Sequence, residues 1–262
     1  MKTFCPYHSF DVSVQDAKRI QKELRDFVEI CDTISNIDRI ELVGGADVSF
    51  IDSIPYPPVR FSDGNDNVNS DSSRTFLLGH EIRKTNTTAL AAVVTYDVKH
   101  GCAVETVFMT APVLIPYIPG FLSFREGPAL LAALGELSVL PEVMIYDGCG
   151  IAHPRGLGLA SHMAVLSGIP SVGCAKSKLC GTCSDPGTGK GEWTNISYKN
   201  TTVGTCLRTR DHVRPVFVSP GSGVSINSAR KLVLSLAKKY RLPEPIRLAH
   251  SSVTSQKKRG LL

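Results

Sequence analysis

Hydrophobic positions in the first half of the chain follow two different periods. Over residues 13–30 apolar residues recur at helical spacing between charged ones, which predicts an amphipathic helix. Residues 39–51 alternate apolar and polar positions and predict a strand. The apolar runs 89–96 and 103–108 are joined by a short Lys-His-Gly turn, so we expect an antiparallel pair of strands beside the first strand.

The middle of the chain alternates strand and helix patterns. Residues 143–146 and 170–175 are short apolar runs, and residues 158–166 between them predict a helix. This order is a βαβ unit, in which the two strands are parallel. Pro128 is suited to the first turn of an earlier helix, which we expect to continue through residues 129–137.

The remaining segments complete the predicted fold. Residues 203–207 and 216–218 return to a strand pattern, and residues 229–236 predict a late helix. Two polar segments, 53–75 and 181–199, lack periodicity and predict loop insertions. Antiparallel strands followed by a βαβ unit indicate an α/β fold, in which a mixed central sheet carries helices on both faces. We expect all 262 residues to form one such domain.

Composition and charge exclude several classes of protein. Hydrophobic residues make up 42% of the chain and charged residues 20%, which supports a buried core and argues against disorder. No apolar run reaches the roughly 18 residues of a membrane span, and the start lacks the apolar stretch of a signal peptide. We therefore expect no membrane partner, no secretion, and a cytoplasmic location, or a nuclear or nucleolar one in a eukaryote. The net charge of +5 permits a polyanionic partner without requiring one.

Charged side chains lie at or near the ends of the predicted elements. In open α/β sheets functional groups gather beyond the carboxyl ends of strands, where Asp147 and Lys176 are expected. Asp47 interrupts an apolar strand, and burying its charge is costly unless it is paired or bound to a metal. With Glu126, these acids form a set of oxygen ligands suited to Mg²⁺ or Mn²⁺. The alternative is structural: Asp147 in a turn, and Glu126 at a helix start.

The segment 146–162 that follows one predicted strand is rich in glycine. Its glycines allow backbone to approach a ligand, and Arg155 offers a fork for a phosphate group. His153 and His162 flank a helix start, a position that favours anions. His162 is equally compatible with an ordinary hydrogen-bonded histidine on a helix face.

Five blocks of sequence resemble one known family. The blocks are ADVSF around Asp47, PYIPGFLSFREGPALLAAL at 116–134, DGCGIAHPRGLGLASH at 147–162, GCAKSKLCG at 173–181 and YRLPEPIRLAH at 240–250. In these blocks, which occur in the family's order, the chain resembles endonuclease V, a nuclease that nicks nucleic acid near deoxyinosine or inosine. The resemblance implies a ribonuclease H-like fold with a two-metal type of active site.

The resemblance also implies roles for individual residues. Asp47, Glu126 and Asp147 match the metal-binding acids of the family, while Lys176 and His250 match its supporting catalytic residues. His250 would serve either as a further metal ligand or as a proton shuttle. The implied cofactor is Mg²⁺, with Mn²⁺ able to substitute.

Substrate contacts are expected from a wedge that separates strands, from glycines around a pocket for the altered base, and from the glycine-rich segment. These residues are Pro116, Tyr117, Ile118, Pro119, Gly120, Gly148, Gly150, His153 and Arg155. For Tyr117 the alternative to the wedge is an aromatic side chain packed under the proline connector. Two positions depart from the family pattern, because many members have His or Asn at Cys149 and His at Ser222.

The implied reaction is hydrolysis of the second phosphodiester bond 3′ of inosine, which leaves a 3′-hydroxyl and a 5′-phosphate. The partner would be DNA or RNA that contains inosine, and we expect a monomer. Two other functions are compatible with the same pattern. One is a ribonuclease H-like nuclease that acts on hybrid duplexes, and the other is a nucleic-acid-binding protein of the same fold without catalysis.

Overall fold

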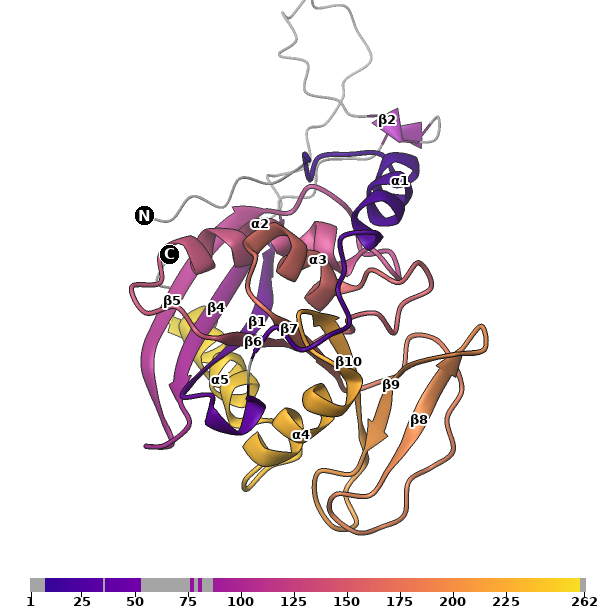
Figure 1. Ribbon diagram of the computed structural model, residues 1–262. Helices are drawn as coiled ribbons and strands as arrows, with labels where there is room; N and C mark the ends of the chain where they lie inside the picture. Colours follow the sequence, from indigo (N-terminus) through magenta and orange to yellow (C-terminus); the bar gives the residue numbers. More distant parts are fainter. Residues whose placement is uncertain (1–7, 35, 53–75, 78–79, 82–86, 260–262) are drawn as a thin grey trace, which may run out of the picture.

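A mixed eight-stranded sheet forms the centre of the computed structural model, which describes residues 8–34, 36–52, 76–77, 80–81 and 87–259 (Figure 1). The strand order is β5-β4-β1-β6-β7-β10-β9-β8. The bounds of these strands are β1 (Leu42–Asp52), β4 (Thr87–Asp97), β5 (Cys102–Pro112), β6 (Val143–Tyr146), β7 (Ser171–Ala175), β8 (Trp193–Tyr198), β9 (Thr201–Leu207) and β10 (Val216–Ser222). A separate short hairpin pairs β2 (Phe76–Leu77) with β3 (His80–Glu81). The insertion predicted at 53–75 lies outside the described residues.

Helices cover both faces of this sheet, which confirms the predicted fold class (Figure 1). Apolar side chains of α1, α2 and α3 bury one face, and those of α4 and α5 bury the other. The helices are α1 (Val14–Arg25), α2 (Leu122–Gly135), α3 (Leu159–Ser167), α4 (Ile226–Leu236) and α5 (Glu244–Arg259), with a 3₁₀ turn η1 at Ile37–Arg39. Within the described ranges, no helix combines the length and the apolar character that a membrane span requires.

The predicted strand pairings are confirmed. β1 pairs antiparallel with β4, and β4 pairs antiparallel with β5. β6, α3 and β7 form the predicted βαβ unit, and their two strands are parallel. The register of these strands determines where the residues of the candidate site lie.

Three elements differ from the sequence prediction. Helix α2 begins at Leu122, so Pro128 lies inside the helix rather than at its start. The first turn forms earlier because Phe124 is fully buried and its N–H bonds to the Phe121 carbonyl at 3.1 Å. Helix α5 was not predicted, because only four of its sixteen residues are buried and its pattern is correspondingly weak. β8 occupies the second half of the segment 181–199 that we expected to be a loop.

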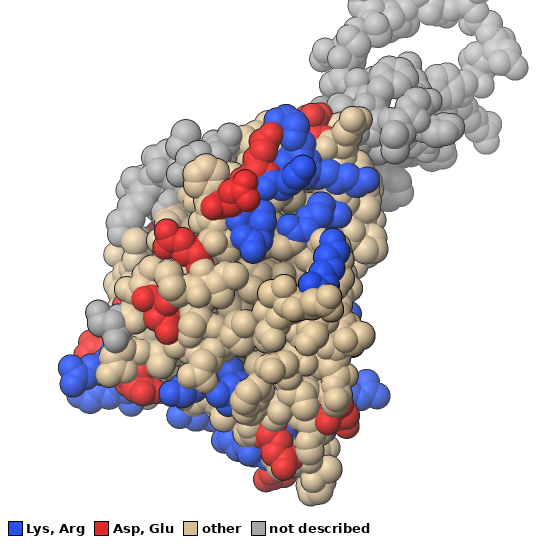
Figure 2. Space-filling view, turned by 45° about the vertical axis from the view of Figure 1, so that its right-hand side comes forward, with Lys and Arg blue, Asp and Glu red and all other residues tan. Residues whose placement is uncertain are grey.

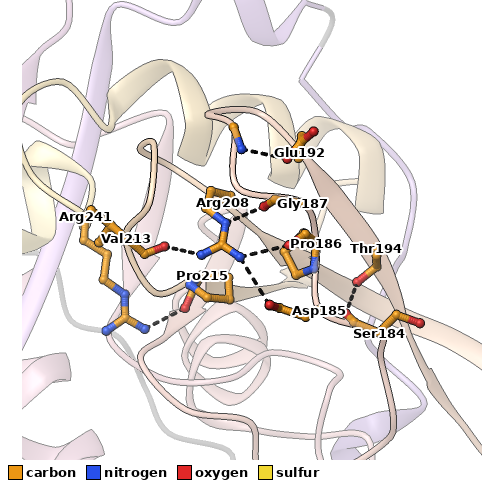
Figure 3. Close-up of polar contacts among 11 residues, drawn as sticks. Ser184, Asp185, Pro186, Gly187, Glu192, Thr194, Arg208, Val213, Pro215 and Arg241 are labelled. Carbon is orange, nitrogen blue, oxygen red and sulfur yellow. Dashed lines mark hydrogen bonds and ion pairs between the residues drawn. The ribbon is translucent and has the colours of Figure 1, made fainter.

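β8 is an edge strand, which explains why its sequence resembles a loop. Ile196 is its one buried residue, so the polar residues around it give little strand signal. The preceding segment is a loop held by Arg208, whose side chain is 8% exposed. Its guanidinium donates to the carbonyls of Gly187 at 2.6 Å, Pro186 at 2.9 Å and Val213 at 2.5 Å (Figure 3). One buried arginine thus orders a connection that has no core of its own.

The parallel pairing of β1 with β6 places two acids side by side. Ala46 pairs with Tyr146, so the next residues along the two strands are Asp47 and Asp147. β6 ends at Tyr146, whereas β1 continues to Asp52. Asp47 therefore lies just past the end of β6, where β1 is no longer paired with that strand. Its side chain can reach the space beyond the carboxyl end of β6.

Helix α5 lies directly against β1 because the strand has a glycine at the crossing point. A Cβ atom on Gly45 would overlap the backbone carbonyl of Pro245. Gly45 and Asp47 are two residues apart and therefore face the same side of the sheet. The close approach allows His250, one turn further along α5, to reach Asp47.

Gly45→Ala is expected to destabilise the protein by about 1–3 kcal/mol, since the added methyl group must displace α5. Without this overlap alanine would be the better strand residue, so the sign of the change identifies the close contact. Urea unfolding measures the effect. Gly189→Ala is the matched control, because the atoms nearest to its Cβ belong to the Glu192 side chain and lie 3.4 Å or more away. Equal stabilities of the two variants would contradict the prediction.

Candidate active site

Three carboxylates from three different elements meet at the carboxyl end of β6. Asp47 comes from β1, Asp147 follows β6, and Glu126 reaches the same place from α2. The side chains of Asp47 and Asp147 are only 15% and 16% exposed. The sequence predicted that these three acids and Lys176 would lie close together, and the structure brings them to one place.

The crowding of these acids changes their titration. Burial raises the pKa of Asp47, and the nearby charge of Asp147 raises it further, against a lowering by His250. Burial raises the pKa of Glu126 well above its ordinary value, and the charges of Asp47 and Asp147 add to this effect. The site therefore gathers three acidic groups, and the neighbouring protein groups neutralise their negative charge only in part.

Two basic side chains partly compensate that charge. His250 Nδ1 lies 2.7 Å from Asp47 Oδ2, and Lys176 Nζ donates to Asp147 Oδ2 at 2.5 Å. Burial disfavours the charge of Lys176, yet its hydrogen bond to Asp147 and the charges of Asp147 and Asp47 raise its pKa. No described residue donates a hydrogen bond to Glu126, whose carboxylate is left without such a partner.

The donor set fits a hard divalent cation. All three acids offer carboxylate oxygens, and a cation between them would offset the burial and the repulsion by Asp47 and Asp147 that together raise the pKa of Glu126. Across the described part of the chain, no group of three or more acidic, histidine or cysteine side chains is arranged so that it could hold a metal ion. Asp47 and Asp147 instead contact His250 and Lys176, so a bound ion would exchange these contacts for its own.

A pocket of about 280 Å³ opens beside the carboxylates. Eight of the residues singled out from the sequence line it: Tyr117, Ile118, Pro119, Gly120, Asp147, Gly148, His153 and Lys176. Pro116, Gly150 and Arg155 do not line it, and neither do Asp47, Glu126 and His250. The Gly150 N–H instead donates to Ser219 Oγ at 2.8 Å, which holds the glycine turn against β10. The structure thus joins the predicted catalytic acid, the wedge and the base pocket in one cavity.

The rim of this pocket is held by a single backbone carbonyl, that of Gly120. It accepts hydrogen bonds from Gln21 Nε2 at 2.9 Å, Arg155 Nη2 at 2.7 Å and His153 Nε2 at 3.0 Å. Gly120 has a φ of +84°, and a Cβ atom there would lie 2.9 Å from the Arg155 guanidinium. We refer to Gln21, His153 and Arg155 as the Gly120 clamp. It fixes the loop that carries Tyr117.

His153 and Arg155 therefore have a positioning role that the sequence did not indicate. Burial lowers the pKa of His153 to about 4, and the charge of Arg155 adds to this lowering. The Arg155 N–H donates to His153 Nδ1 at 3.2 Å, which leaves the proton of the neutral ring on Nε2. Arg155 also stacks on Phe121, 4.4 Å from the ring centre. Direct phosphate binding by Arg155 stays a prediction.

The structure decides the alternatives for two other residues. His162 is fully buried and bonds to Ser123 Oγ at 2.8 Å and to His8 Nε2 at 2.7 Å, as an internal histidine. Burial lowers its pKa to about 3. Tyr117 is 68% exposed, so it is not packed under the proline connector.

The two departures from the family pattern lie in different places. Cys149 lines the pocket, and burial raises the pKa of its thiol to about 12, which gives a neutral wall beside Asp147. Ser222 lies outside this pocket, and its Oγ accepts the Glu29 N–H at 3.0 Å.

Sequence reasoning missed two residues that position the site. Gln21 is fully buried on the apolar face of α1, and a polar residue on such a face is a signal that the sequence contained. Arg241 donates to the Pro215 carbonyl at 2.6 Å (Figure 3) and also to the Lys176 carbonyl at 2.9 Å. Its position in the block YRLPEP gave no indication of this contact, which joins segments far apart in the sequence.

A mixed sheet with acidic residues on and just after its central strands, flanked by helices on both faces, defines the class of ribonuclease H-like nucleases. A family model described as Endonuclease V matches residues 72–251. The Endonuclease V of Petrotoga mobilis is 36% identical over 254 residues, which cover 97% of this chain and 98% of that protein. The chain belongs to the endonuclease V family.

Solved structures support the same relationship. The Endonuclease V of Streptomyces avermitilis superposes with a TM-score of 0.76 at 33% identity and covers 95% of each chain. The Endonuclease V of Ciona intestinalis, in complex with a 23mer DNA containing an inosine followed by a ribo-adenosine, gives a TM-score of 0.71 at 25% identity. That superposition covers 94% of this chain and 97% of the other.

The lowered pKa of His153 predicts a loss of stability in acid. The unfolded chain binds this proton below about pH 6.5, whereas the folded protein resists it until about pH 4. The stabilisation is thus complete above pH 6.5 and is lost as the pH falls toward 4, by up to about 1.4 kcal/mol per pH unit. His153→Gln removes this proton-binding group, so the slope of the unfolding free energy against pH, measured by urea unfolding, is expected to fall by the contribution of one proton. An unchanged slope would contradict the buried, neutral state of His153.

Proposed function

We propose that this member of the endonuclease V family is a divalent-metal-dependent nuclease that nicks strands containing inosine. The cut falls at the second phosphodiester bond 3′ of the inosine and leaves a 3′-hydroxyl and a 5′-phosphate. One observation carries the proposal: Asp147 and Lys176 line the same pocket as Gly120, Gln21 and His153, and the charges of Asp47 and Glu126 lie close to Asp147. A relative bound to inosine-containing DNA supports the same substrate class.

Asp47, Glu126 and Asp147 are the residues that we assign to hold Mg²⁺, or Mn²⁺ in its place, and His250 is a fourth candidate ligand. A bound divalent ion would neutralise charge on the phosphate, lower the pKa of a water molecule and stabilise the leaving oxygen. Lys176, held against Asp147, presents a point charge that orients the attacking water or the scissile phosphate. His250 is 54% exposed, which also suits an exchange of protons with solvent.

The pocket suits the recognition of a base through backbone groups. Hypoxanthine differs from adenine in its C6 carbonyl and its protonated N1, so a site without charged readers can distinguish the two. Protein donors already occupy the Gly120 carbonyl. We therefore assign the reading of the base to the other backbone groups of residues 117–120 and of Gly148 and Cys149, which line the pocket. The neutral thiol of Cys149 forms part of this wall.

The exposed Tyr117 fits the role of a wedge. It lies on the rim of the pocket, in a loop fixed by the Gly120 clamp. A base can enter such a pocket only after it leaves its stack, which costs energy in a duplex. A rigid aromatic side chain beside the pocket would occupy the space that the base leaves behind.

One assay tests the proposal as a whole. Matched DNA and RNA strands, with and without a single inosine, are incubated in Mg²⁺, in Mn²⁺ and in EDTA, and the product ends are mapped. The proposal requires cleavage that depends on both inosine and metal. Cleavage of hybrid duplexes without inosine would indicate the ribonuclease H-like alternative, and binding without any cleavage would indicate a non-catalytic protein. Sedimentation of the same sample tests the expected monomer.

Asp147→Ala is expected to reduce cleavage by about 10²–10³-fold or more, because one of three charge-concentrating ligands is lost. Binding of an inosine strand in EDTA should change little, since it depends on basic contacts to the backbone. Asp38→Ala, which removes an exposed acid from η1, is the control and should keep full activity. Mg²⁺-dependent turnover of the Asp147 variant within about tenfold of the parent would refute the assignment.

Tyr117→Ala is expected to reduce cleavage of inosine in a duplex more than in a single strand, because a wedge acts only where strands must separate. The ratio of kcat/KM on the two substrates measures this effect. Phe27→Ala is a matched control, because Phe27 is also 68% exposed and lies outside the pocket. Equal losses on both substrates would show that Tyr117 is not a wedge.

A further inference from the structure

A second and larger hollow lies on the other side of the Gly120 clamp. It has a volume of about 630 Å³ and runs between α1 and the turn that joins β8 to β9. His153 lines both this hollow and the base pocket, and Arg155 lines the hollow alone. We refer to this second hollow as the α1 groove. Only the clamp separates it from the pocket that holds the altered base in the proposed function.

The α1 groove is strongly basic. Lys18, Lys22 and Arg25 lie at positions i, i+4 and i+7 of α1 and form one stripe about 10 Å long. Lys199 faces them from the turn after β8, and Asp26 is the one acid among the lining residues. Figure 2 shows basic side chains gathered over the α1 end of this face.

The charges of this stripe are not neutralised by the protein. Arg19, which points away from the groove, pairs with Asp16 at 3.5 Å and with Glu23 at 3.0 Å. No acid among the described residues pairs with Lys18, Lys22 or Lys199 in the same way. Three exposed lysines without an acidic partner among the described residues are what a polyanion neutralises, with release of its own counterions.

We propose that the α1 groove binds the sugar-phosphate backbone of the substrate strand on the 5′ side of the inosine. The inference rests on the proposed function and adds a binding surface to it. In that function the scissile bond is 3′ of the inosine, so the 3′ side of the strand lies toward Asp147 and Lys176. Gln21 and His153 of the clamp line the same pocket, and His153 also lines the α1 groove. A strand that leaves the pocket past His153, away from Asp147 and Lys176, runs in the 5′ direction and enters the groove.

Helix α1 links the two surfaces. Gln21 contributes to the clamp from the buried side of the helix, while Lys18 and Lys22 project from its exposed side. A nucleic-acid backbone bound by these lysines would therefore contact the same helix that holds the rim of the base pocket through Gln21. The expected ligand is a single strand, because the groove offers charge and hydroxyl groups and no side chain arranged to read base pairs.

The test uses the full chain and two sets of inosine oligonucleotides. One set has a long extension 5′ of the inosine and few nucleotides beyond the cleavage position, and the other set has the extension on the 3′ side. Fluorescence anisotropy in EDTA measures the affinity of each set over a range of salt concentrations. The variant combines Lys18→Gln, Lys22→Gln and Lys199→Gln, which leaves Arg155 and the clamp intact.

The control variants separate charge position from net charge. Lys99→Gln, Lys231→Gln and Lys238→Gln together remove the same charge from exposed positions outside the groove. The triple change of Lys18, Lys22 and Lys199 to Arg keeps the charge in the groove. We expect both controls to bind like the parent, and thermal melting in the same buffer confirms that each variant is folded.

The groove variant is expected to lose about tenfold or more in affinity for the 5′-extended strands at low salt, with little change for the 3′-extended strands. The slope of log affinity against log salt should fall in magnitude by about 2, for three phosphate contacts at about 0.7 each. Cleavage of a strand without the 5′ extension should be unchanged.

Three results would overturn the inference: equal binding of the 5′-extended strands by parent and variant, an unchanged salt slope, or an equal loss on the 3′-extended strands. The test also distinguishes failure of the proposed function. If the parent cuts no inosine strand in Mg²⁺ and the groove variant still loses its 5′ affinity, the groove is supported and the proposed activity is wrong.

Discussion

The active site depends on the pairing of β1 with β6, which places Asp47 and Asp147 side by side at the point where β6 ends. Two carboxylates at this spacing repel each other, and Glu126 adds a third negative charge with no hydrogen-bond donor among the described residues. The neighbouring structure compensates this repulsion with Lys176 and His250. Lys176 stands at the end of β7, and His250 stands on a helix that reaches β1 because Gly45 has no side chain. The same uncompensated charge is what makes the site suitable for a divalent cation.

A second constraint connects this centre with the surfaces around it. The Gly120 carbonyl receives three hydrogen bonds, from α1 and from the loop after β6, and it thereby fixes the rim that carries Tyr117. Because His153 is neutral and buried, the clamp adds no titrating charge near the substrate at neutral pH. Its far side borders the α1 groove. The position of one backbone carbonyl therefore connects the rim of the 280 Å³ pocket, the exposed Tyr117 and the inner wall of the α1 groove.

Particular residues show how far the sequence alone could be interpreted. The acids Asp47 and Asp147 were predictable, because each interrupts or ends an apolar run whose period identifies a strand. Helix α5 was not, because its burial is confined to a narrow stripe that the surrounding polar residues obscure. Its histidine was identified only through resemblance to a family. Gln21 had a signal, a polar residue on an apolar helix face, but that signal does not name the partner.

The sequence by itself determined the fold class, the strand pairing at the start of the sheet and the acids of the candidate site. These features depend on local periodicity and on the cost of burying charge, and both are properties of residues near each other in the chain. Only the tertiary structure decided that Arg155 supports a carbonyl, that Arg241 holds the Lys176 backbone, and that α1 carries a basic groove beside the base pocket. Each of these contacts joins segments tens of residues apart, and long side chains such as arginine reach several alternative partners. Which partner an arginine meets is set by the packing of the whole core, so no local pattern can specify it.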